Sequence, residues 1–117
     1  MLPGQYSIRG MDETLKKIKQ VILETARKYG IEVDRIILFG SRARGDYRDD
    51  SDWDILVVTR EEYSKKKILN FIASLKIELA KREIPNDIVV KGRRELEKDL
   101  KYRYTVSYSA VKEGVTI

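Results

Sequence analysis

The sequence predicts a small α/β or α+β domain whose mixed sheet has three or four strands. Short apolar runs typical of strands that are covered on both sides occur at 36–39, 53–59 and 87–91. Longer amphipathic segments with helical spacing alternate with these runs. The length of 117 residues fits a single domain, 1–117, built on one core.

The first expected element is a helix that Asp12 can cap and that Gly30 ends. The ten residues before it, MLPGQYSIRG, are interpreted as an N-terminal extension. The apolar face of this helix is directed at the core and comprises Leu15, Ile18, Ile22 and Tyr29.

Two strands follow, one ending in the run Ile36–Phe39 and one spanning Trp53–Thr59. The polar segment Arg42–Asp52 between them is too short for an ordinary crossover helix. We expect a short helical turn and a loop there.

The second half of the chain continues the alternation. An amphipathic helix is expected from about Glu61 to Arg82, with Ile68, Ile72, Leu75 and Leu79 at helical spacing. Pro85-Asn86 then breaks the pattern, and Asp87–Lys91 is the third strand. One or two further helical pieces follow and end at Gly114; these pieces are Arg93–Leu100 and Tyr102–Glu113.

The tyrosines near the C-terminus admit two interpretations. Leu100, Tyr104, Tyr108 and Val111 follow helical spacing, which favours core packing with a partner-facing surface. Their basic neighbours would also suit base stacking, so contact with RNA is the alternative.

The composition narrows the chemistry. The chain has no cysteine and no histidine, which excludes disulfides, thiolate ligands and imidazole. A reaction here must use carboxylates, hydroxyls, lysine and arginine. No apolar run of membrane-spanning length and no signal-peptide pattern occur, so we expect a cytoplasmic protein without membrane contact.

Charge is distributed unevenly along the chain. The net charge is +5, but residues 44–54 contain two arginines and five aspartates, a balance of −3, so the remainder sums to +8. A basic body around an acidic pocket suits a site for metal cations and a polyanion, although lysine-rich proteins often show the same total.

Three aspartates are candidate metal ligands. Asp52 and Asp54 stand one residue apart at a strand start, so their side chains share a face about 7 Å apart at Cα and could share two divalent ions. Asp87 opens the third strand and joins them if the second and third strands are neighbours. Mg²⁺ suits such oxygen ligands. The other carboxylates of the segment are interpreted as a solvated loop; they are Asp46, Asp49 and Asp50.

Gly40-Ser41 supplies a second half of this site. Glycine allows a sharp turn after the first strand, and free backbone N–H groups with the Ser41 hydroxyl could bind phosphate. Arg42 and Arg44 could neutralise phosphate oxygens or simply pair with nearby aspartates.

The pattern GSRARG, followed by SDWDILV and a later strand-borne Asp87, resembles the minimal nucleotidyltransferases of the DNA polymerase β-like superfamily. The resemblance implies a palm-like fold. It also implies that Asp52 and Asp54 bind two Mg²⁺ ions and that Asp87 shares one ion and accepts the proton of the attacking hydroxyl. Gly40 and Ser41 would hold the triphosphate of ATP, whose AMP is transferred with release of pyrophosphate.

The resemblance further implies a partner. Minimal nucleotidyltransferases of this size act as antitoxins of HEPN-domain ribonuclease toxins, in some cases by adenylylating a toxin tyrosine. HEPN active sites need a histidine, which this chain lacks, so it is not itself the toxin. The alternatives are a non-catalytic antitoxin that only binds its partner, and nucleotidyl transfer to a small molecule or nucleic acid. Direct nucleic-acid binding is not expected.

Overall fold

The computed structural model describes residues 4–117, and side chains from Asp12 onward. No helix in that range is both long and apolar enough to cross a membrane. Five helices and four strands form in the described range, in the order α1 Gly4–Tyr29, β1 Val33–Phe39, α2 Gly40–Arg44, β2 Trp53–Thr59, α3 Lys65–Lys81, β3 Asn86–Gly92, α4 Arg93–Asp99, α5 Val106–Glu113 and β4 Val115–Thr116.

The four strands form one mixed sheet in the order β3-β2-β1-β4. Strand β1 is antiparallel to both β2 and β4, whereas β2 and β3 are parallel. Parallel neighbours need a crossover connection, and α3 provides it. The predicted class, a small α+β domain with a mixed three- to four-stranded sheet, is confirmed.

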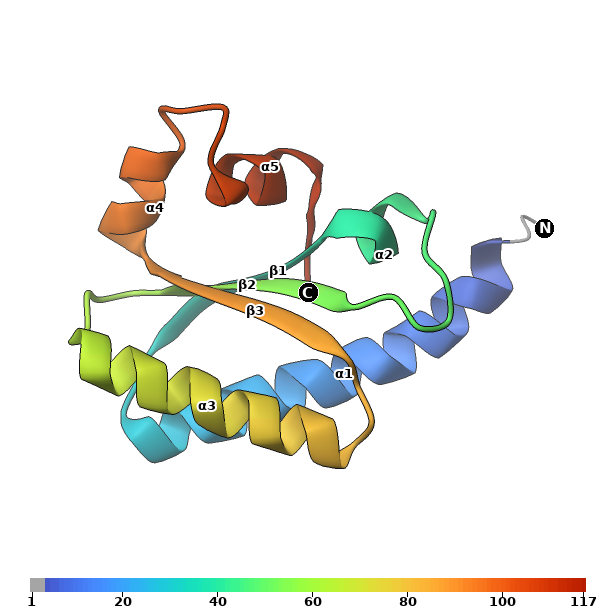
Figure 1. Cartoon of the computed structure of the whole chain (residues 1–117), viewed down its shortest axis with the longest axis horizontal. Helices are drawn as coiled ribbons and strands as arrows, with labels where there is room; N and C mark the ends of the chain where they lie inside the picture. The colour runs from blue at the N-terminus through green and yellow to red at the C-terminus, as the bar shows by residue number, and fades with distance from the viewer. Residues whose placement is uncertain (1–3) are drawn as a thin grey trace.

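Helices α1 and α3 cover one face of the sheet, drawn below it in Figure 1. Ile18 and Ile22 of α1 are completely buried, and Phe71 and Leu75 of α3 are too. These side chains pack with alternate residues of the strands, among them Trp53, Ile55 and Val57 of β2. The predicted core faces are confirmed at Ile18, Ile22, Leu75 and Leu79, whereas Phe71 is a core residue that the predicted spacing did not include.

Helices α4 and α5 lie on the opposite face, above the sheet in Figure 1. Leu96 of α4 and Ala110 of α5 pack there against Ile37, Leu56 and Val58. Because side chains alternate along a strand, Asp54 lies on this second face together with Leu56. The small second core thus sets the side of the sheet that carries the acidic residues.

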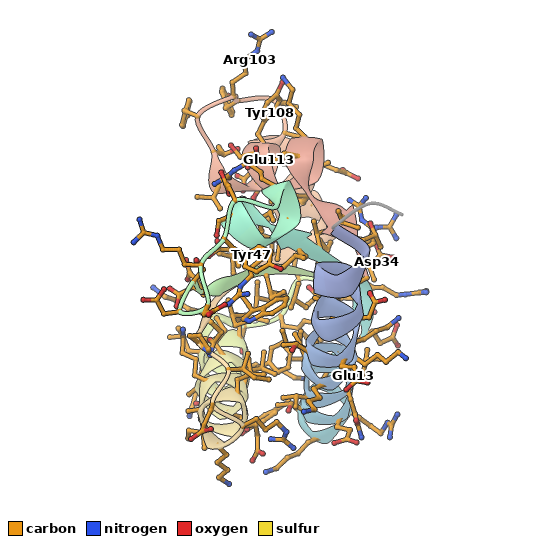
Figure 2. All side chains as sticks on the ribbon, turned by 90° about the vertical axis from the view of Figure 1, so that its right-hand side faces the viewer. Glu13, Asp34, Tyr47, Arg103, Tyr108 and Glu113 are labelled. Carbon is orange, nitrogen blue, oxygen red and sulfur yellow. The ribbon has the colours of Figure 1, made fainter. Side chains whose placement is uncertain are left out.

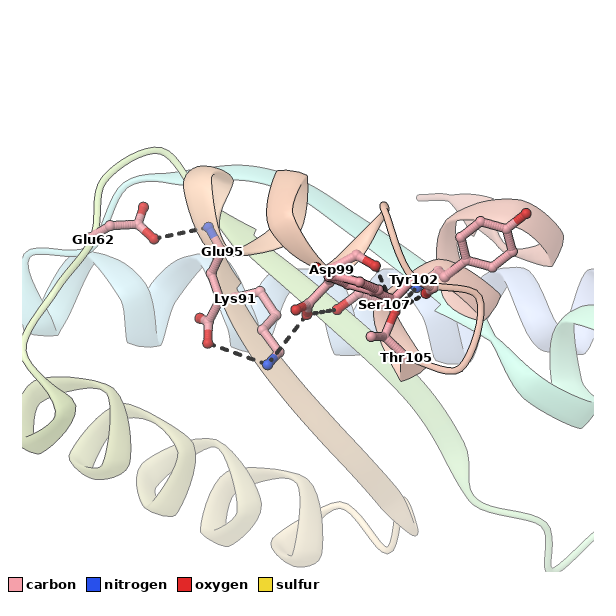
Figure 3. A network of polar contacts seen from close by, with 8 residues as sticks. Glu62, Lys91, Glu95, Asp99, Tyr102, Thr105 and Ser107 are labelled. Atoms are coloured by element: carbon pink, nitrogen blue, oxygen red, sulfur yellow. Dashed lines mark hydrogen bonds and ion pairs between the residues drawn. The ribbon is translucent and has the colours of Figure 1, made fainter.

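A polar network fixes α4 and α5 to β3 (Figure 3). Lys91 of β3 places its ammonium group 3.4 Å from Glu95 Oε2 and 3.5 Å from Asp99 Oδ2, both in α4. The buried Ser107 of α5 donates a 2.7 Å hydrogen bond to the same Asp99 oxygen. One carboxylate therefore joins three elements over the second face.

Two helix starts differ from the sequence prediction. Helix α1 begins at Gly4, so Asp12 lies inside the helix and does not cap it; residues 1–3 of the expected extension lie outside the described residues. An N-cap residue marks the start of a helix only if the residues before it cannot be helical. No proline stands between Gly4 and Asp12, so the helix extends back to Gly4. Helix α3 begins at Lys65 instead of Glu61, because the Ser64 hydroxyl accepts a hydrogen bond from the Lys67 N–H and caps it.

The tyrosine segment also differs. Helix α5 begins only after Thr105, whose hydroxyl accepts a hydrogen bond from the Tyr108 N–H. Tyr104 precedes this cap and is 85% exposed, so its predicted place on a packed helix face is wrong. Leu100 and Val111 do pack against the second core. The helical spacing of these residues in the sequence therefore continues across a turn that interrupts the helix in the structure.

Candidate active site

Asp54 and Asp87 are direct neighbours on the parallel strands β2 and β3. Their Cα atoms are registered partners at the ends where both strands begin, and Asp54 also faces Phe39 of β1. Alternation places both carboxylates on the face that α4 and α5 cover. The expectation that a distant aspartate joins the Asp52-x-Asp54 pair at one end of the sheet, here called the carboxylate end, is met by this register.

The carboxyl group of Asp54 has a raised pKa, and its causes locate the neighbours. Burial of the half-exposed side chain contributes most, followed by the negative charges of Asp87 and Asp52. The positive charge of Arg44 acts in the opposite direction. The pKa of Asp54 thus depends on both other aspartates, and the three negative charges repel one another at the carboxylate end.

Gly40 begins α2 directly beside Asp54. Its φ is +72°, in the left-handed region that glycine adopts without strain. A Cβ atom at this position would overlap Oδ2 of Asp54. Glycine is therefore required twice, once for the turn and once for the close approach of the backbone to the carboxylate. Ser41 follows, half-buried, and no side-chain cap occupies the start of this short helix.

Arg42 lies on the opposite face of the sheet from Asp54 and Asp87. Its guanidinium group lies 4.4 Å from the ring centroid of Trp53 and 4.5 Å from that of Tyr47. Trp53 packs on the α1 and α3 side of the sheet, opposite to Asp54. Arg42 is only 7% exposed, and its hydrogen bonds run to backbone carbonyls of the following loop. The two aromatic partners were not predicted from the sequence, although both lie between Gly40 and Asp54 in the chain.

Arg44 lies on the carboxylate side. Its guanidinium pairs with Asp46 Oδ2 at 3.3 Å and with Glu113 Oε1 of α5 at 3.4 Å. In the end-on view of Figure 2, Glu113 lies above α2 and Tyr47 below it. Glu113 stands 69 positions from Arg44 in the chain, so no local pattern indicated this contact.

The remaining loop carboxylates stay apart from this arrangement. Asp46, Asp49 and Asp50 are exposed, and only Asp46 has an ion-pair partner among those described, the Arg44 guanidinium. Asp49 contributes its backbone carbonyl to Arg42. Their interpretation as a solvated loop agrees with these positions.

The donor set of Asp52, Asp54 and Asp87 fits a hard divalent cation, because it offers only carboxylate oxygens and its mutual repulsion would be relieved by positive charge. Among the side chains described, those of residues 12–117, no three acidic groups converge tightly enough to form a ready-made metal site. Mg²⁺ commonly binds one or two carboxylates and completes its shell with water and substrate phosphates. The open arrangement of these three aspartates is compatible with this mode of Mg²⁺ coordination.

A family model of known proteins matches most of this chain. Residues 16–115 match the family model described as "Polymerase beta, Nucleotidyltransferase". The matched range contains both halves of the candidate site, the Gly40-Ser41 turn and the three aspartates.

Two relatives occur in Methanocaldococcus jannaschii, and both are named as candidate protein adenylyltransferases. MJ0604 is 51% identical over 43 residues, which cover 37% of this chain and 43% of that protein. MJ0141 is 43% identical over 49 residues, which cover 42% of this chain and 46% of that protein. The matched stretches thus span less than half the length of either relative.

Solved structures share the fold. A candidate nucleotidyltransferase from Sulfolobus solfataricus superposes with a TM-score of 0.59 at 26% identity, covering 93% of this chain and 83% of that one. A candidate minimal nucleotidyltransferase gives 0.57 at 24% identity, covering 90% and 94%. A toxin-antitoxin structure with AMP-PNP gives 0.53 at 19% identity, covering 83% and 69%.

Proposed function

Because this chain belongs to the polymerase beta nucleotidyltransferase family, we propose that it is a minimal nucleotidyltransferase domain that transfers AMP from ATP to a hydroxyl acceptor in the cytoplasm. The observation that carries this proposal is the register of Asp54 with Asp87, beside the Gly40 turn. Carboxylates and the Gly40 turn, which would bind phosphate, meet there at one end of the sheet.

The residues of the carboxylate end have separate roles in this reaction. Asp52 and Asp54 would hold two Mg²⁺ ions, and Asp87 would share one of them. These ions supply charge neutralisation for the attacking and leaving oxygens of an in-line displacement. The backbone N–H groups after Gly40 and the Ser41 hydroxyl would bind the triphosphate, and Arg44, whose charge acts on Asp54, would neutralise phosphate oxygens.

The step itself is a substitution at the α-phosphorus of ATP. The acceptor oxygen forms a bond to this phosphorus while the bond to the bridging oxygen of the β-phosphate breaks, and pyrophosphate leaves. Asp87, the more exposed member of the registered pair, takes the proton of the acceptor hydroxyl. The protein otherwise acts by holding both reactants in line.

For the acceptor, we infer a tyrosine of a HEPN-domain toxin, with this chain acting as its antitoxin. Two observations support this inference: the relatives named as candidate protein adenylyltransferases and the fold shared with a toxin-antitoxin protein. A non-catalytic antitoxin that masks its partner is the second candidate; Tyr104 at 85% exposure and Val106 at 53% exposure favour a binding surface near α5. Transfer to a small molecule or nucleic acid is the third.

The test combines the purified chain with labelled ATP, Mg²⁺ and the product of the adjacent gene. We expect label on the partner with wild-type protein and none with Asp54→Ala or Asp87→Ala. Asp50→Ala, an exposed carboxylate of the same loop, is the matched control and should label normally. The function would be that of a non-catalytic antitoxin if the chain binds its partner tightly, leaves it unlabelled, and binds equally well with either substitution. Label on RNA or a small acceptor instead of the protein would identify the third candidate.

A further inference from the structure

Arg42 is a buried cation in a segment that is otherwise largely exposed. Its side chain is 7% exposed, while Arg44, Asp49 and Asp50 around it are exposed. A charged side chain is buried at such a position only when its hydrogen bonds are satisfied. The contacts of its guanidinium group therefore indicate its role.

The hydrogen-bond acceptors of Arg42 are backbone carbonyls of the loop that carries Asp52. Nη2 donates to the Ser51 carbonyl at 2.9 Å and to the Asp49 carbonyl at 3.1 Å, and Nε donates to Ser51 at 3.3 Å. Ser51 is the residue immediately before Asp52. The guanidinium thus binds the main chain one position before Asp52, a candidate metal ligand.

Two aromatic rings lie close to the guanidinium group. Its central carbon lies 4.5 Å from the Tyr47 ring centroid and 4.4 Å from the Trp53 ring centroid. Trp53 is the residue immediately after Asp52, and it is buried at the start of β2. Arg42 therefore contacts the residues on both sides of Asp52.

We propose that Arg42 is a positioning residue, which fixes the loop at 45–52 so that the Asp52 carboxylate stays next to Asp54. The proposal deepens the proposed function, on which it rests, by giving Arg42 a role other than phosphate binding. Its side chain is on the Trp53 side of the sheet, whereas Asp54 and Asp87 are on the other side. The support of Asp52 by Arg42 is of the kind that orients metal ligands from outside the coordination shell.

The chemistry of arginine is specific to this task. A planar fork can bind one carbonyl through two nitrogens and stack between two rings at once, which an ammonium group cannot do. Arg42→Lys therefore keeps the positive charge and loses the paired hydrogen bonds to Ser51 and the ring contacts. A residue that bound phosphate as a point charge would tolerate that change better.

The experiment compares Arg42→Lys and Arg42→Gln with Arg48→Gln, an exposed arginine of the same loop. Amide hydrogen exchange of residues 45–52 and Mn²⁺ affinity by calorimetry are measured without turnover. Both Arg42 variants should exchange faster in this loop and bind Mn²⁺ about tenfold more weakly or worse. In kinetics, kcat should fall about 100-fold while KM for ATP changes less than about threefold. Arg48→Gln should match wild type.

Wild-type loop exchange and Mn²⁺ affinity in both Arg42 variants would overturn the proposal, as would a raised KM for ATP as the sole effect. If Arg42→Gln does not fold, Tyr47→Leu removes one of the two rings beside the guanidinium and should change loop exchange and Mn²⁺ affinity in the same direction. A wild-type protein that binds Mn²⁺ but transfers no AMP would contradict the proposed function alone, because the exchange and affinity measurements decide the role of Arg42.

Discussion

The backbone of Gly40 lies so close to the carboxylate of Asp54 that a Cβ atom would overlap Oδ2. The two residues come from different elements, the start of α2 and the start of β2. This contact joins the turn proposed to bind phosphate to the candidate metal ligands, and it makes the glycine sensitive to the smallest substitution.

Gly40→Ala should reduce both stability and nucleotidyl transfer. The positive φ alone costs about 1–2 kcal/mol for a residue with a Cβ, and the overlap displaces Asp54. Gly45→Ala is the control, because Gly45 has a φ of +89° but a Cβ atom there would meet no other atom within 4 Å. Urea denaturation should show a loss in both variants, larger for Gly40→Ala, and only Gly40→Ala should lose transfer activity. Equal activity in the two variants would refute the contact's importance.

Asp54→Asn should stabilise the metal-free protein near neutral pH. Because burial and two neighbouring charges raise the pKa of Asp54, its protonated form favours the folded state, and that contribution is lost as pH rises through the raised pKa. The variant should therefore melt above wild type in EDTA at neutral pH and equal it below pH 3.8, the ordinary value.

Mg²⁺ should reverse this ranking. A cation that binds only the folded carboxylate end stabilises wild type and not Asp54→Asn. Asp50→Asn serves as the control, since its exposed carboxylate should change neither the EDTA result nor the response to Mg²⁺. An Asp54→Asn protein that responds to Mg²⁺ like wild type would place the metal elsewhere.

Arg44→Gln should move the pH dependence of Mn²⁺ binding upward. The Arg44 charge lowers the pKa of Asp54, so without it the proton competes with the metal up to a higher pH. Mn²⁺ affinity followed over a pH series should show its acidic midpoint shifted to higher pH relative to wild type and Arg48→Gln. A downward shift would contradict the assigned direction.

Ser107→Ala should lower the free energy of unfolding by about 1.5–3 kcal/mol, since it removes a hydrogen bond to a charged partner. The Ser107 hydroxyl is buried and donates to Asp99 at 2.7 Å, where the carboxylate also meets Lys91. Ser109→Ala, at an exposed position of the same helix, should change this free energy by less than about 0.5 kcal/mol. Urea denaturation of both variants provides the comparison.

Local patterns in the sequence determined the order of elements and the two buried helix faces. Apolar periodicity depends only on residues a few positions apart, so Ile18, Ile22, Leu75 and the strand Trp53–Thr59 could be identified without a structure. The same reasoning failed at Asp12 and Tyr104, because a helix boundary depends on which neighbouring residues compete for the backbone N–H groups.

The candidate site divides in the same way. Residue type and spacing sufficed to select Gly40, Ser41, Asp52 and Asp54, which lie close together in the chain. Only the tertiary structure decided that Asp87 is registered with Asp54, that Glu113 pairs with Arg44, and that Arg42 turns toward Trp53 on the opposite face. Those facts depend on strand register and on contacts between distant elements, which the packing of the whole chain fixes and no local pattern encodes.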